Sequence, residues 1–208
     1  MERGIGSLAR AAARSAALTL ALVGLALGQE PRDATPKVSD QPFSTEQLAV
    51  YRTMLASWFG GGKAKVNLGS LTDPVAVYDD SLDRTCLKGL SWEAIVNGQV
   101  HRVRAEDLTQ LGPFEFHLVE PKAGEKEVSN NDPGKAIQKG KPVDEAVDNG
   151  FAHGLLTISE IRFDKLHMHA LVSFSFVCGG LCGNATTMLL EKKDGTWKKK
   201  AQCGGWVS

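Results

Sequence analysis

The segment from His167 to Cys178 constrains the fold more than any other part of this 208-residue chain, because polar and apolar residues alternate along most of it. Successive side chains of a β-strand point to opposite faces, so this pattern predicts a strand that is buried on one face. The solvated face would carry His167, His169, Ser173 and Ser175. The buried face would carry Met168, Ala170, Val172, Phe174, Phe176 and Cys178.

Three further strands are expected around this one. Leu155–Asp164 precedes it, and Ala185–Lys192 and Thr196–Cys203 follow it. Asp194-Gly195, between the last two segments, is a strong signal for a two-residue hairpin turn. Short connections between successive strands favour an antiparallel meander.

An amphipathic helix is predicted upstream, where apolar residues recur at three- and four-residue steps. Ser44 and Gln47 have the spacing of a capping box, and Gly60-Gly61-Gly62 marks the C-terminal end of the helix. The apolar stripe between them contains Leu48, Tyr51, Met54, Leu55, Trp58 and Phe59. A stripe this rich in aromatic residues predicts a helix face that packs on the core.

The middle of the chain gives weaker patterns. We expect short strands at Val66–Leu71, Val75–Tyr78 and Phe114–Val119, and short helices at Trp92–Val96 and Ala105–Leu111. Residues 121–141 are polar and are expected to form an exposed loop before a short helix near Ala136. Pro142 suits the first residue of a following helix.

These elements predict an α+β fold, in which an antiparallel C-terminal meander of four or more strands is covered by N-terminal helices. The arrangement resembles cystatin-like and NTF2-like folds, and a resemblance of fold alone carries no function. With 42% hydrophobic residues, a chain of this length can bury a core of its own.

The N-terminus has the layout of a secretory signal peptide. Three arginines precede an apolar run from Ala16 to Leu27, which is shorter than the ~20 residues of a membrane-spanning helix. Ala26 and Gly28 are small at the positions that signal peptidase reads, which predicts cleavage before Gln29. We therefore expect an exported protein, periplasmic or extracellular, with no integral membrane segment in the mature chain.

The sequence divides into three parts on this interpretation. Residues 1–28 form the signal peptide, residues 29–43 a proline-containing flexible lead-in, and residues 44–208 a single α+β domain.

All four cysteines lie after the predicted cleavage site, and an even number in an oxidising compartment predicts two disulfides. The spacing of Cys178, Cys182 and Cys203 does not fit the paired C-x2-C pattern of zinc ribbons. Cys178 and Cys203 would lie on strands separated by a third, roughly 9–10 Å apart, which is too far for a disulfide. The expected pairs are therefore Cys182–Cys203 and Cys86–Cys178.

The charge of the chain excludes some classes of partner. With 24 Lys and Arg against 24 Asp and Glu, no basic footprint for nucleic acid is present. The acidic cluster at residues 79–83 lacks the alternating ligands and the glycine of a calcium-binding EF-hand loop, so we expect a solvated loop there. No glycine-rich phosphate-binding motif points to a nucleotide cofactor.

His167 and His169 are the strongest candidates for chemistry. Residues i and i+2 of a strand share a face, so the two imidazoles could bind one metal ion, with Asp164 or His153 as a third ligand. The alternative is that both histidines lie on a solvated strand face near a turn and bind nothing.

Several C-terminal motifs are distinctive, namely Cys178-Gly179-Gly180-Leu181-Cys182-Gly183-Asn184, Glu191-Lys192-Lys193-Asp194-Gly195-Thr196-Trp197 and Trp206-Val207-Ser208. Upstream stand Cys86-Leu87-Lys88-Gly89 and Gly140-Lys141-Pro142-Val143-Asp144. With these motifs the chain resembles a family of uncharacterised exported bacterial proteins. The resemblance implies an exported bacterial globular domain and a structural role for Cys182, and it carries no activity, substrate or catalytic residue over to this chain.

The sequence favours a non-catalytic binding or structural domain with two disulfides. The first alternative is a metal-dependent hydrolase that uses His167 and His169. The second is a small-ligand-binding protein with a pocket on the apolar side of the sheet. That pocket would exist only where Phe174, Phe176 and Trp197 leave the space unfilled.

Overall fold

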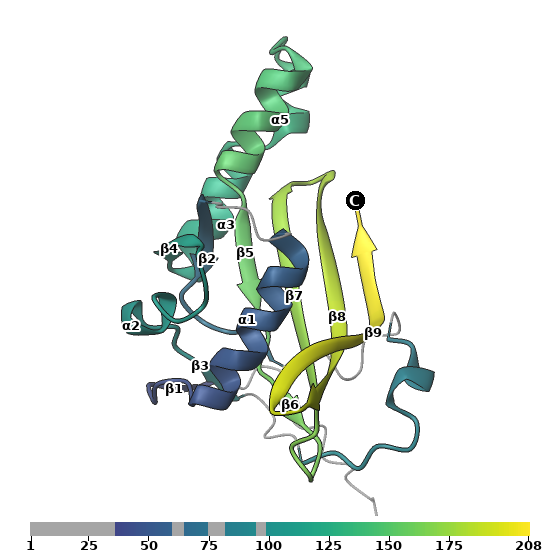
Figure 1. The fold of residues 1–208 in the computed structure, drawn as a ribbon. Coiled ribbons are helices and arrows are strands. Elements are labelled where there is room, and N and C mark those ends of the chain that lie inside the picture. The colour runs from purple at the N-terminus through teal and green to yellow at the C-terminus, as the bar shows by residue number, and fades with distance from the viewer. Residues whose placement is uncertain (1–35, 60–64, 75–81, 95–98) are drawn as a thin grey trace, which may run out of the picture. The chain divides into compact units, whose positions relative to one another are not determined.

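The C-terminal strands join strands from the N-terminal half of the chain in one mixed sheet (Figure 1). The computed structural model describes residues 36–59, 65–74, 82–94 and 99–208. The helices are α1 (Thr45–Phe59), the 3-10 helix η1 (Arg84–Leu87), α2 (Ala105–Leu108), α3 (Pro121–Asn130), α4 (Pro133–Gln138) and α5 (Val143–Ala152). The strands are β1 (Lys37–Ser39), β2 (Lys65–Gly69), β3 (Gln99–His101), β4 (Glu115–Val119), β5 (Leu155–Ile158), β6 (Arg162–Phe163), β7 (His169–Gly179), β8 (Cys182–Lys193) and β9 (Thr196–Val207).

Among the described residues, seven strands form this sheet, in the order β4-β2-β5-β7-β8-β9, with β6 beside β7. The antiparallel neighbours β5, β7, β8 and β9 confirm the predicted meander, and the fold class is α+β as expected. The sheet is mixed because β2 pairs with both β4 and β5 in parallel. Parallel pairing needs a long crossover, and α3, α4 and α5 supply it between β4 and β5.

Helix α1 covers one face of the meander, here called the inner face, and lies across β7 in Figure 1. Its start confirms the predicted capping box. The Ser44 N–H donates to Oε1 of Gln47 (2.8 Å), and the Gln47 N–H donates to Oγ of Ser44 (3.2 Å). Tyr51, Met54 and Leu55 are fully buried against the sheet. The glycines expected to end the helix lie outside the described residues.

The opposite face of the meander, here called the outer face, is covered at both ends. Leu171 is buried beneath residues 82–92, and Val177 packs near α3 beside Val128. Ser173 and Ser175 point to the same face between these two covers. The expectation that this whole face meets water is therefore wrong at its ends, because Leu171 and Val177 interrupt the polar positions.

The structure contains two disulfides, Cys86–Cys203 and Cys178–Cys182, with Cα–Cα distances of 5.6 and 5.0 Å. Both predicted pairs, Cys182–Cys203 and Cys86–Cys178, are wrong. Cys203 lies in the outer-face cluster beneath η1, which carries Cys86, whereas Cys178 belongs to the inner core. Cys182 follows Cys178 across the tight β7–β8 turn, so these two meet on adjacent strands.

Residues 121–130 of the polar stretch 121–141 form helix α3, where a loop was predicted. Pro121 occupies the first turn of α3, where its missing N–H is not needed. Gly124 and Val128 form the buried stripe of this helix, which is too narrow to be visible in a mostly polar segment. The short helix expected near Ala136 is confirmed as α4.

Other predicted elements are present with shifted ends. β4 and the short α2 lie within the predicted segments, and β2 begins one residue before its predicted segment and ends two residues earlier. Helix α5 begins directly after Pro142, its N-cap. The Asp194-Gly195 hairpin is confirmed, with both residues at positive φ (52° and 74°). The strand expected at Leu155–Asp164 divides into β5 and β6.

Two further segments differ from expectation. Trp92 forms an antiparallel bridge to Asp164 where a helix was expected to begin. Residues 37–39, inside the expected flexible lead-in, form β1 and pair in parallel with β3.

The predicted signal peptide, residues 1–28, and the strand expected at Val75–Tyr78 lie outside the described residues. None of the helices in the described ranges has the length and apolar run required to cross a bilayer.

The disulfides give a first test, because they close loops of very different length. Replacing Cys86 and Cys203 with alanine removes a link across 117 residues and should lower the free energy of unfolding by about 5 kcal/mol. The matched pair Cys178→Ala and Cys182→Ala removes a link across 4 residues and should lower it by about 2 kcal/mol. Denaturant unfolding measures both, and equal or reversed losses would contradict the assigned pairing.

Candidate functional site

The structure separates the two histidines that were expected to share a metal ion. β7 begins at His169, so His167 lies before the strand, in a turn with a φ of +52°. Asp164 builds this turn, because its Oδ1 accepts the backbone N–H groups of Met168 (2.7 Å) and His169 (2.8 Å). The premise that both rings project from one strand face is therefore wrong.

Each histidine instead has its own partners. Nδ1 of His169 lies 3.2 Å from Oδ2 of Asp164, and its Nε2 lies 3.1 Å from Nζ of Lys200. His153, the other candidate ligand, pairs with Glu127 on α3 (2.8 Å). Within the ranges that the structure describes, no group of three or more His, Cys, Asp or Glu residues is arranged to hold a metal ion.

His167 connects three segments. Its Nδ1 lies 2.9 Å from Oε2 of Glu46 on α1, and its Nε2 lies 3.1 Å from Oε1 of Glu93. The ring stacks on Phe163, with centroids 4.8 Å apart and planes 7° apart. A protonated imidazole donates from both nitrogens, so both carboxylates favour the charged form. The hydrogen bond to Glu46 is the main cause of a raised His167 pKa, and Glu93 adds to it.

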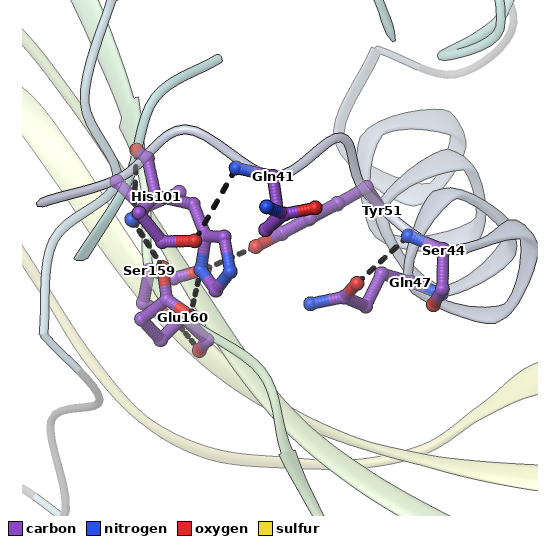
Figure 2. A network of polar contacts seen from close by, with 9 residues as sticks. Gln41, Ser44, Gln47, Tyr51, His101, Ser159 and Glu160 are labelled. Carbon is purple, nitrogen blue, oxygen red and sulfur yellow. Dashed lines mark hydrogen bonds and ion pairs between the residues drawn. The ribbon is translucent and has the colours of Figure 1, made fainter. Parts of the chain in front are cut away.

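A second polar network lies at the end of β5, where the carboxylate of Glu160 joins two other segments (Figure 2). Oε2 of Glu160 pairs with Nδ1 of His101 (2.8 Å), and Oε1 accepts the His101 backbone N–H (2.9 Å) and the Thr72 hydroxyl. The side chains of His101 and Glu160 are only 13% and 12% exposed. Because these side chains are buried, the network has a structural role and is not an open catalytic site. The network of Glu160, His101 and Thr72 is here called the Glu160 clamp.

Tyr51 ties the same region to helix α1. Figure 2 shows its side chain reaching toward Ser159, whose carbonyl oxygen accepts the tyrosine hydroxyl at 2.9 Å. Burial raises the pKa of Tyr51 well above its usual value, and the carboxylates of Glu160 and Asp107 add to the effect. The hydroxyl therefore stays protonated and serves as a fixed donor.

This clamp positions Asp73. The Asp73 N–H donates to the carbonyl of Ile158 (2.8 Å), and its own carbonyl accepts the N–H of Glu160 (2.7 Å). The side chain points to the outer face, where Oδ2 accepts the Thr157 hydroxyl (2.7 Å). Asp73 is exposed to solvent. The atoms packed around its carboxyl group nevertheless desolvate it, and this raises its pKa despite the hydrogen bond from Thr157.

Beside Asp73, the outer face contains a hollow of about 170 Å³, here called the outer hollow. Its floor consists of small residues in two rows of cross-strand neighbours. The first row is Ser175 and Ala185, and the second is Ser173 and Thr187. Thr157 and Trp206 continue the first row on the neighbouring strands, and Gly204 continues the second. Asp73 and Pro74 line one side and Trp206, 42% exposed, lines the other.

The hydroxyls of the floor are held by one another. The Thr157 and Ser175 oxygens lie 3.0 Å apart, and those of Ser173 and Thr187 lie 2.8 Å apart. Ser159 also lines the hollow, and its Oγ accepts the backbone N–H of Ser173 (2.9 Å). The floor is therefore an ordered surface of hydrogen-bonding groups.

The pocket expected on the apolar side of the sheet is filled. Phe174, Phe176 and Trp197 are 2%, 6% and 5% exposed. Trp58 of α1 packs on both phenylalanines, with ring centroids 4.9 and 5.5 Å away. The outer hollow thus opens on the face opposite to the expected pocket.

Comparison of the chain with known proteins found no matching family model, no matching curated protein and no matching solved structure. The ligand of the outer hollow is therefore inferred from the geometry of the hollow alone.

The ion pairs of His167 predict a defined pH dependence. Because its pKa is raised in the folded protein, its stabilising effect is complete below the ordinary value of 6.5 and disappears as the pH rises through the folded-state pKa. His167→Gln should lower the free energy of unfolding by about 0.5 kcal/mol at pH near 5.5, the scale of half-exposed ion pairs. At pH near 9 the ion-pair part of this difference should be absent, so the loss should be smaller and limited to the stacking on Phe163.

His117→Gln is the matched control, because His117 is exposed on β4 and forms no ion pair with any described residue. Denaturant titrations at the two pH values provide the measurement. A loss for His167→Gln that is equal at both pH values, or larger at high pH, would contradict the ion-pair assignment.

Proposed function

We propose that this protein is an exported binding domain, stabilised by its two disulfides, with the outer hollow as its ligand-binding site. The signal-peptide pattern before Gln29 and the resemblance to exported bacterial proteins support export. Two disulfides are typical of a protein that matures in an oxidising compartment.

The observation that carries the binding proposal is the open part of an otherwise covered sheet face. Residues 82–92 cover one end of the outer face and α3 covers the other, yet the surface between them consists of small, ordered polar residues. Concave sites with a few convergent polar groups and a carboxyl of perturbed pKa are typical ligand-binding sites. The Glu160 clamp fixes the position of Asp73 on one side of the hollow, so the site is formed without a ligand.

Filling the hollow tests this proposal. Ala185→Phe places a ring at the centre of the first row, between Ser175 and Trp206. We expect the variant to fold with a free energy of unfolding within about 1 kcal/mol of the wild type, since Ala185 is partly exposed. Small polar compounds that bind the wild type in ligand-observed NMR should no longer bind it.

Lys198→Phe is the control, because it adds the same ring to an exposed position of β9 that does not line the hollow. It should leave binding unchanged. Compounds that bind wild type and Ala185→Phe equally would contradict the assignment of the site.

Export has its own test. When the full chain is expressed in a bacterium, the protein recovered outside the cytoplasm should begin at Gln29 and contain no free thiol among its four cysteines. Protein that keeps residues 1–28 and remains in the cytoplasm would contradict this part of the proposal.

A further inference from the structure

We propose that the outer hollow binds a neutral saccharide, with one face of a sugar ring against Trp206 and the sugar hydroxyls on the floor and on Asp73. This inference rests on the proposed function, because it names the ligand class of the same site.

The charges of the lining select against ionic ligands. Among the described residues that line the hollow, Asp73 is acidic and none is basic. An anion would meet the Asp73 carboxylate without any compensating cation. A single carboxylate that already accepts the Thr157 hydroxyl is also a weak site for a cation.

The polar groups of the floor match ligand hydroxyls. Each serine or threonine hydroxyl both donates and accepts hydrogen bonds, and a pair such as Ser173 and Thr187 uses only part of that capacity. Sugar hydroxyls also donate and accept, so they can join these pairs without leaving a group unsatisfied. The Asp73 carboxylate accepts only, and it would accept a charge-assisted hydrogen bond from a sugar hydroxyl.

Trp206 supplies the apolar surface that a sugar ring also needs. A pyranose presents axial C–H groups on one face, and these pack favourably on the electron-rich face of an indole. The Trp206 ring lies close to Gly183, where an added Cβ would come within 3.2 Å of the ring. Gly205 allows β9 to approach Ala185 closely, because a Cβ there would overlap the Ala185 carbonyl oxygen.

The size of the hollow fits one ring. Its volume of about 170 Å³ corresponds to about six water molecules of the liquid.

The test uses saturation-transfer NMR and calorimetry on the oxidised protein. The saccharide probes are glucose, galactose, mannose, N-acetylglucosamine and the β-linked disaccharides of glucose and N-acetylglucosamine. Glycine, succinate, putrescine and adenosine represent other ligand classes. We expect saturable binding of at least one saccharide, weakened about tenfold or more by Trp206→Ala and by Asp73→Asn.

Two matched variants control for these substitutions. Val207→Ala changes an exposed neighbour of Trp206, and Asp148→Asn removes an exposed carboxylate on α5, so both should leave saccharide affinity unchanged. Binding that is equally weakened by the controls would overturn the assignment to the hollow.

The remaining outcomes separate the two proposals. If a non-saccharide probe binds and loses affinity in Trp206→Ala and Asp73→Asn, the saccharide inference fails while the binding function stands. If none of the probes binds the hollow, the saccharide inference fails, and equal binding of other compounds to wild type and Ala185→Phe overturns the binding function as well.

Discussion

The covalent bond between Cys86 and Cys203 decides how much of the sheet stays open. Cys203 faces away from α1, so its partner comes from a segment laid over the outer face, and that segment also buries Leu171. At the other end of β7, α3 covers Val177. The outer hollow is the part of the face that neither cover reaches, and the Glu160 clamp supplies its wall by fixing Asp73 beside β5.

The parts of the fold that depend on local sequence could be predicted. The capping box of Ser44 and Gln47 and the Asp194-Gly195 turn involve residues within a few positions of each other, and both are present. The meander followed from alternation along β7 and the short loops around it. Helix α3 was missed because Gly124 and Val128 make a buried stripe too small to register against polar neighbours.

The candidate site could not be predicted, because it depends on contacts distant in sequence. The disulfide pairs depend on which face of the sheet each cysteine occupies and on where residues 82–92 lie over the outer face. Both are set by the folded chain and cannot be read from the spacing of the cysteines. His167 lies outside β7 because hydrogen bonds to the Asp164 carboxylate form a turn just before the strand. One signal for the hollow was available, namely Ser173 and Ser175 on alternating positions of β7, since they predict a polar sheet face there.

The central claim is that ligands bind the outer face and not the inner core. The four tryptophans report on this directly, since Trp206 lines the hollow, Trp58 and Trp197 lie in the inner core, and Trp92 belongs to the segment that covers the outer face. The protein would be labelled with 5-fluorotryptophan, followed by fluorine NMR, and titrated with the compound that binds the wild type most tightly. We predict that the Trp206 resonance shifts with saturation and the other three stay in place. Shifts at Trp58 or Trp197 with an unmoved Trp206 would contradict the account.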